Sequence, residues 1–173
     1  EIPIQSTPEL MEYLGLFVGD GWTRTGRGEL GFALPENKLG RKILLKLHKK
    51  IFKANKFRLE KEYVYINSVN IARFIDSLGF GKGAKNKTIS PWVFTLPRKE
   101  RQAFVDGLIL SDGYKVEKSF RYVSSSHELL VRLRLLLQTL DYRVGKIHWR
   151  KIKKGGKCAK RFLLKDTESG YIC

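Results

Sequence analysis

Cysteine, long apolar runs and acidic residues are scarce in this 173-residue chain, and each scarcity excludes a class of protein. Cys158 and Cys173 are too few for a secreted disulfide framework, and neither belongs to a Cys-x-x-Cys metal motif. His48, His127 and His148 are dispersed, so they predict no zinc site. No segment has the apolar length that spans a bilayer, and no basic-then-apolar leader opens the sequence. We therefore expect a soluble, intracellular protein with no membrane partner, in a prokaryotic cytoplasm or an organelle.

Positive charge, by contrast, is abundant. The chain contains 34 Lys and Arg against 17 Asp and Glu, a formal net charge of +17. Its length suits one compact domain, or two small halves that share one core. A polyanionic partner is the natural inference from this charge. Because the sequence runs from Glu1 to Cys173 without an initiator Met, we interpret it as a processed, trimmed or excised product.

The first 79 residues predict a helix, a hairpin, a helix, a second hairpin and a third helix. Thr7 followed by Pro8 is typical of a helix start. Residues 22–34 and 57–66 alternate as hairpin strands do. Between them, apolar residues recur every four positions, which predicts a helix with one core face and one basic face. Ser68 begins the last, short helix of this unit.

A second unit repeats this order after a linker. Pro97 starts a helix that reaches about residue 111, and residues 116–124 resemble strands. Ser125 with Glu128 forms a capping box for a Leu-rich helix, and residues 142–151 and 160–164 form a hairpin. The unit lacks a last helix. We therefore divide the chain into a first repeat (1–79), a flexible cationic linker (80–95) and a second repeat (96–173), which form one compact unit.

Both units carry the same motif at the end of their first helix. Residues 14–21 read LGLFVGDG and residues 106–113 read DGLILSDG, with Gly, Leu, Asp and Gly in frame. A single Asp-Gly after a helix is most simply an ordinary helix end, but two copies in register favour a shared function. Gly15 with Gly19, and Gly107 with Ser111, are four residues apart, so each pair lies on one helix face and permits close helix packing.

Such packing would bring Asp20 and Asp112 together at the negative ends of two helix dipoles. A carboxylate in that position costs up to about 1 kcal/mol, and a neighbouring negative charge adds to the cost. A bound cation would remove it. Carboxylate and carbonyl oxygens favour Mg²⁺, an ion that commonly supports phosphoryl transfer.

The segments YLGLFVGDG (13–21) and VDGLILSDG (105–113) resemble the two motifs of single-chain LAGLIDADG homing endonucleases, the intron- or intein-encoded type. The resemblance covers the whole chain. It implies an α/β (α+β) fold of two pseudo-symmetric repeats, with an antiparallel saddle over DNA and the motif helices packed at the centre. It also implies that a monomer cuts both strands of a long, asymmetric double-stranded DNA site and leaves short 3′ overhangs.

The same resemblance implies the catalytic residues and the cofactor. Asp20 and Asp112 would hold metal, with the backbone carbonyls of Gly19 and Ser111 contributing. The metal would be Mg²⁺, with Mn²⁺ as a substitute and Ca²⁺ as an ion that binds without supporting cleavage. Lys115, three residues beyond Asp112, is the candidate catalytic lysine; the alternative is that it is one of many surface lysines.

The basic catalytic residue of the first repeat stays open. Thr23 and Arg24 occupy the place comparable to Lys115. At the junction of the first hairpin and its following helix, where the family has a polar residue, Glu36 or Asn37 is the candidate.

Basic and polar residues of the expected strands are the candidates for DNA contact, because a twisted β-ribbon fits the major groove. Arginine can read guanine edges, whereas most lysines contact phosphate and make affinity depend on salt. For any single residue, a solvated surface charge is about as good an explanation. The candidates are Arg24, Arg27, Arg58, Lys61, Tyr63, Arg121, Ser124, Arg143, Lys146, His148, Arg150, Lys153, Lys154 and Arg161.

Two other functions fit the same charge and scaffold. One is an RNA-binding intron maturase, and the other is a DNA-binding regulator that does not cut. The paired aspartates favour the nuclease, because a protein that only binds nucleic acid has no need for two crowded carboxylates.

Overall fold

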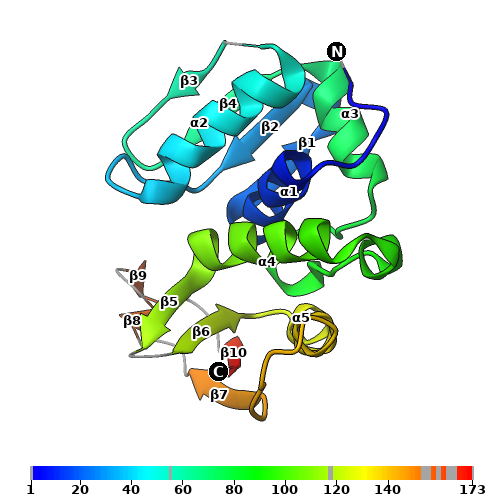
Figure 1. Ribbon diagram of the computed structural model, residues 1–173. Coiled ribbons are helices and arrows are strands. Elements are labelled where there is room, and N and C mark those ends of the chain that lie inside the picture. The colour runs from blue at the N-terminus through cyan, green and yellow to red at the C-terminus, as the bar shows by residue number, and fades with distance from the viewer. Residues whose placement is uncertain are drawn as a thin grey trace.

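The computed structural model describes residues 2–54, 56–116, 119–152, 157–158, 161–162 and 167–172. They form two similar α/β units, each with its own four-stranded antiparallel sheet. Helix α1 (Pro8–Asp20) and helix α4 (Arg98–Asp112) pack against each other along the middle of the molecule, between the two sheets (Figure 1). The expected mixed fold with central motif helices is confirmed.

The first unit contains every element that the sequence predicts. After α1 come β1 (Gly21–Arg24), a 3-10 turn η1 (Thr25–Arg27), β2 (Glu29–Phe32), α2 (Leu39–Phe52), β3 (Arg58–Leu59), β4 (Val64–Asn67) and α3 (Val69–Ser77). The helix starts follow the predicted caps, because Thr7 Oγ1 accepts a hydrogen bond from Leu10 N at 3.2 Å and Ser68 Oγ accepts one from Ile71 N at 3.4 Å. The strand order is β1-β2-β4-β3.

The second unit repeats this arrangement after two 3-10 turns, η2 (Ala84–Asn86) and η3 (Pro91–Thr95). Helix α4 is followed by β5 (Gly113–Val116), β6 (Ser119–Ser124), α5 (His127–Gln138), β7 (His148–Ile152), β8 (Lys157–Cys158), β9 (Arg161–Phe162) and β10 (Thr167–Ile172). Its sheet order, β5-β6-β10-β7, matches that of the first unit if β10 takes the place of β4. Within the described ranges, strands β8 and β9 pair with each other in a separate two-stranded sheet.

Two local expectations about the second unit are wrong. Helix α5 is capped by Ser126, whose Oγ accepts a hydrogen bond from Leu129 N at 3.1 Å, and not by Ser125. Consecutive serines all have the chemistry of a cap, so the sequence did not distinguish them. Strand β7 pairs with Thr167–Ile172, whereas Arg161–Phe162, the described part of the expected partner, pairs with β8. The alternation that predicted the hairpin lies partly in the separate β8–β9 pair, which intervenes between the true partners.

One hydrophobic core extends through both units. Leu30 and Phe32 point inward from β2, and Leu44 joins them from α2; Leu130 and Tyr122 occupy comparable places in the second unit. On the first sheet the opposite face carries aromatic side chains, among them Trp22 and Tyr65, whose rings pack together. Within the described ranges, no helix combines the length and apolarity needed to cross a membrane.

Candidate active site

The two motif helices touch backbone to backbone. A Cβ added to Gly15 would lie 2.1 Å from the carbonyl oxygen of Phe104, and one added to Gly107 would lie 2.1 Å from that of Glu12. Both distances are far shorter than any real Cβ contact, so glycine is required at both positions. This close approach, which the sequence predicted, brings the ends of the two helices to one place.

Asp20 is the last residue of α1. Its pKa depends on its burial and on the nearby carboxylate of Asp112. The side chain of Asp20 is only 11% exposed. Burial, and then the negative charge of Asp112, raise the pKa of Asp20 to about 6, although Lys38 and Lys87 act in the opposite direction. Asp112 thus lies near enough to Asp20 to affect its charge, although the two carboxylates come from different halves.

Asp112 ends α4 in the same way and lies on the more open side of the site. Loss of hydrating water raises its pKa as well, while Lys87 and Lys38 lower it. The buried ring of Tyr122 lies close by, and after burial itself the charges of Asp112 and Asp20 are the largest causes that raise the pKa of its hydroxyl. Both aspartates therefore act electrostatically on the same buried hydroxyl at the junction of the two helices.

Lys38 links the two motifs. It stands at the start of α2, and its Nζ lies 3.3 Å from Asp20 Oδ2 and donates a hydrogen bond to the carbonyl oxygen of Ser111 at 2.9 Å. Because both contacts are made by the same nitrogen atom, Asp20 Oδ2 and Ser111 O lie close to each other. One ammonium group contacts a carboxylate of the first half and a backbone oxygen of the second.

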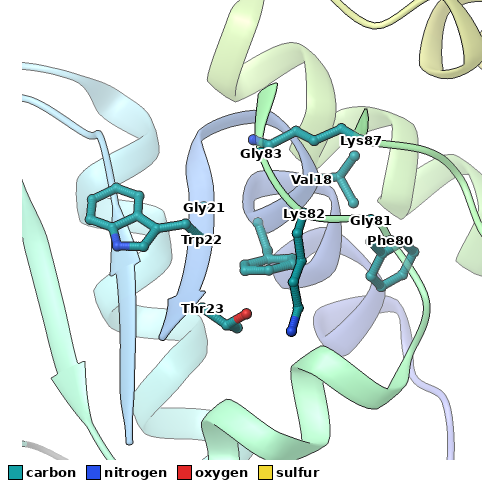
Figure 2. A pocket seen from close by; sticks show the side chains of 10 residues that line it. Val18, Gly21, Trp22, Thr23, Phe80, Gly81, Lys82, Gly83 and Lys87 are labelled. Carbon is teal, nitrogen blue, oxygen red and sulfur yellow. The ribbon is translucent and has the colours of Figure 1, made fainter. Parts of the chain in front are cut away.

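Lys87 makes the reciprocal contact from the linker. Its Nζ donates a hydrogen bond to the carbonyl oxygen of Gly19. Figure 2 shows its side chain extended alongside Val18, above the pocket where the linker residues Phe80 to Gly83 face the start of β1. Ser126 Oγ fixes the backbone by donating to the carbonyl oxygen of Lys87 at 2.6 Å. Burial lowers the pKa of Lys87, whereas Asp112 and Asp20 raise it.

Both lysines are tied to the cap of the helix that follows the first hairpin of a unit. Lys38 is the cap residue of α2, and Ser126, which holds Lys87, is the cap residue of α5. Within the described residues, no group of three or more His, Cys, Asp or Glu side chains forms a metal cluster. Instead, two carboxylates, two backbone carbonyls and two ammonium groups meet at the helix ends. Such a set can bind a cation through its oxygens and an anion through its lysines.

Comparisons with known proteins support the fold. A family model described as the LAGLIDADG-like domain matches residues 99–164. Among solved structures, mesophilic variants of the homing endonuclease I-DmoI have a TM-score of 0.62 to this chain at 16% identity, covering 97% of this chain and 85% of that one. Residues 99–164 therefore match a LAGLIDADG-like domain, and the chain has the LAGLIDADG homing endonuclease fold. Its fold is also similar to the N-terminal LAGLIDADG domain of DUF199/WhiA, with a TM-score of 0.55 and 17% identity, covering 99% and 78% of the two chains.

Two curated proteins are similar to this chain in sequence. The iron-sulfur cluster assembly SufBD family protein ML0593 of Mycobacterium leprae is 27% identical over 140 residues, which are 78% of this chain and 16% of that protein. The replication factor C small subunit of Methanocaldococcus jannaschii is 39% identical over 82 residues, which are 44% of this chain and 4% of that protein. The chain spans only a small fraction of either relative.

The structure leaves several predicted residues of the chain untested. Lys115 lies in β5, paired with Phe120 of β6, but its side chain is outside the described part of the chain. Lys153, Lys154 and the side chain of Arg161 also lie outside it. The catalytic role of Lys115 therefore stays a prediction.

Many of the proposed DNA-contacting residues do lie on or beside the sheets. On the first sheet and its turns, Arg24, Arg27, Arg58 and Lys61 are exposed and Tyr63 is half-buried. On the second sheet, Arg121 lies over the ring of Tyr171 at 4.6 Å, and His148 stacks on the same ring at 5.1 Å. Ser124 and Arg150 lie on β6 and β7, while Arg143 and Lys146 are exposed in the loop that precedes β7.

Lys38 and Lys87 are the site residues that the sequence did not single out. Lys38 directly follows the two residues, Glu36 and Asn37, that were candidates for its junction, and both of these are exposed. Lys87 was interpreted only as part of a cationic linker. Its one signal in the sequence is its place just before Ile89, a buried residue that opens a short apolar stretch.

Proposed function

We propose that this chain is a site-specific endonuclease that cuts both strands of DNA with a divalent metal and leaves short 3′ overhangs. The observation that carries the proposal is the pairing of Asp20 with Asp112, one from each repeat, with a lysine beside each motif carbonyl. A protein that only binds nucleic acid gains nothing from a buried carboxylate whose pKa is raised to about 6.

The donor set suits a hard divalent cation. Asp20, Asp112 and the carbonyl oxygens of Gly19 and Ser111 offer only oxygen ligands, which is the preference of Mg²⁺, Mn²⁺ and Ca²⁺. When bound, such an ion supplies charge stabilisation for the attacking and leaving oxygens of a phosphodiester. Structures of I-DmoI with DNA and Mn, and with DNA and Ca, are similar in fold to this chain at TM-scores of 0.61 and 0.62.

Lys38 and Lys87 take the role of the basic catalytic residues in this proposal. In the free protein, each ammonium group donates to a carbonyl that the metal would use, so cation binding and lysine contact compete for the same oxygens. A lysine released from its carbonyl would remain beside the scissile phosphate and neutralise the charge that develops there. Lys115, the lysine that the sequence suggested, stays the alternative basic residue of the second half.

Double-stranded DNA is the proposed partner, and one chain is enough to cut it. The chain supplies both aspartates and both sheets, so no second copy is needed to complete the site. The net charge of +17 supports strong, salt-dependent attraction to phosphate. Because the two repeats differ in sequence, the DNA site should be asymmetric.

The two curated relatives favour the hypothesis that this chain is encoded within a host protein, as an intein is, over the hypothesis that an intron encodes it. They are an iron-sulfur assembly protein and a replication factor, and each resembles this chain only over a small part of its length. A segment shared by proteins with such different names is best explained as an inserted module. The intein-type alternative is therefore the one we propose.

The test begins with selection of bound sites from a randomised duplex library in Ca²⁺. A plasmid with the selected site is then incubated with the protein and either Mg²⁺ or EDTA. We expect linear product only with Mg²⁺, and we expect Asp20→Asn and Asp112→Asn to bind the site without cutting both strands. Full cutting by either variant would refute the assignment. Specific DNA binding without cutting by the wild type would instead support a regulator, and binding confined to structured RNA would support a maturase.

A further inference from the structure

A carboxylate lies on the outward face of the first sheet, where a DNA-binding protein gains most from positive charge. Leu30 and Phe32 of β2 point into the core, so Glu29 and Gly31 belong to the opposite face. Glu29 is nevertheless buried, with only 7% of its surface exposed. It is covered by side chains of the sheet itself and needs an explanation, because it opposes the attraction of phosphate.

Two arginines from different strands close over Glu29. Arg24 of β1 lies directly opposite it in the sheet and donates from Nη1 to Glu29 Oε1 at 2.9 Å. Arg58 of β3 donates from Nη2 to Glu29 Oε2 at 3.5 Å. The arginine side chains are 51% and 54% exposed, whereas the carboxylate beneath them is 9% exposed. Both carboxylate oxygens are thus occupied, and both guanidinium groups keep donors that face solvent.

Arg58 is fixed from two further sides. Its guanidinium carbon lies 4.0 Å from the centre of the Tyr65 ring, and its Nε lies 3.5 Å from Glu60 Oε1. Tyr65 in turn packs edge-on against Trp22. A side chain with this many partners has lost most of its rotamer freedom before any ligand arrives, which is the condition for selective rather than general binding.

We infer that Glu29 is a positioning residue that sets Arg24 and Arg58 as readers of two nearby guanines in the DNA site. The inference rests on the proposed function and adds a specificity determinant to it. An arginine that only contacts phosphate needs no buried carboxylate, whereas bidentate recognition of guanine N7 and O6 requires a planar fork in a fixed orientation. Because both arginines converge on one carboxylate, the guanines should lie within about three base-pair steps of roughly 3.4 Å.

The test compares the sites selected from a randomised duplex library by the wild type and by Glu29→Gln. We expect Glu29→Gln to lose guanine preference at two nearby positions, by about tenfold or more at each, while its affinity for an unrelated duplex is unchanged or higher. Arg24→Lys and Arg58→Lys keep the positive charge but lose the planar guanidinium group. Each should therefore lose the guanine preference at one of the two positions. Glu62→Gln, at an exposed carboxylate between β3 and β4 of the same sheet, removes the same charge and is the matched control.

Two results would overturn the inference. One is that Glu29→Gln selects the same sequence as the wild type. The other is that Glu29→Gln, with an intact circular dichroism spectrum, weakens binding to all sequences equally. If Glu29→Gln does not fold, the two lysine variants decide the question, because they leave the carboxylate in place. A wild type that selects no sequence would refute the proposed function together with this inference, whereas an unchanged pattern in the variants refutes the inference alone.

Discussion

The two halves of the molecule have the same frame but reach the shared site by different routes. In the first half, Lys38 comes from the start of the helix that follows the hairpin. In the second half, that position is Ser126, which instead holds the backbone of Lys87 from the linker. Each lysine contacts a carbonyl of the helix end nearby, Lys38 at Ser111 and Lys87 at Gly19. Pseudo-symmetry of the backbone therefore does not require that equivalent positions supply equivalent groups.

The largest expected effects are on stability, from substitutions at the close contact between α1 and α4, to which each half contributes one helix. Gly15→Ala and Gly107→Ala each place a Cβ 2.1 Å from a carbonyl oxygen of the opposite helix. We expect each to lower the free energy of unfolding by about 3 kcal/mol or more, because backbone cannot yield as a flexible side chain does. Urea denaturation measures the change. Gly26→Ala is the control, since nothing lies within 4 Å of an added Cβ there; a loss in only one half would show that the crossing is not symmetric.

The next largest effects should separate the two lysines. Lys38→Met and Lys87→Met should each slow cleavage of the selected site by about 10²-fold to 10³-fold, the usual effect of removing one group that stabilises transition-state charge. Binding should weaken only a few-fold. Single-turnover cleavage and filter binding measure the two quantities.

Lys82→Met is the control for the lysine variants, because Lys82 lies in the same linker but pairs with Asp76 at 3.0 Å. Equal losses of cleavage and binding in Lys38→Met or Lys87→Met would make that lysine a phosphate contact. If Lys115→Met instead reproduces the effect expected for Lys87→Met, the second half uses the lysine that the sequence suggested.

A smaller effect should appear in the stability of the metal-free protein. Folding raises the pKa of Asp20 from 3.8 to about 6, so the folded protein holds a proton that the unfolded chain has released between those values. Stability contributed by this group is present at low pH and is lost as pH rises through about 6. Asp20→Asn should therefore raise the free energy of unfolding at neutral pH by roughly 1–2 kcal/mol, because each unit of pKa shift corresponds to about 1.4 kcal/mol and the uncharged amide still bears part of the cost of burial.

Urea denaturation at neutral pH and near pH 4 checks this effect, since the difference between Asp20→Asn and the wild type should shrink at the lower pH. A variant that is less stable than the wild type at neutral pH would show that the attraction of Lys38 outweighs burial and the repulsion from Asp112.

Much of the frame could be predicted from the sequence because its signals are local. Periodicity of four residues gave α2, alternation gave the hairpins of the first unit, and the in-frame glycines gave the crossing of α1 with α4. The same glycines led to Asp20 and Asp112, because a contact between two helix ends follows from their packed faces.

The rest depended on contacts that no local pattern encodes. Lys38 and Lys87 are 18 and 68 residues from the motif residues Asp20 and Gly19 that they contact, and a chain with 34 Lys and Arg offers no contrast that marks them. The pairing of β7 with β10 failed for a related reason, since residues 153–166 intervene and contain a strand pair of their own. The boundaries of the two repeats and the linker stay predictions.

Binding of Mn²⁺ to the free protein at neutral pH tests most directly whether the two halves build one cation site. Electron paramagnetic resonance reports the free ion during a titration of the wild type, Asp20→Asn and Asp112→Asn, with Lys82→Met as the control. Our account predicts that either aspartate variant weakens binding at least about tenfold, because each removes a charged ligand from a shared site, while Lys82→Met binds as the wild type does. Wild-type affinity in both aspartate variants would contradict it.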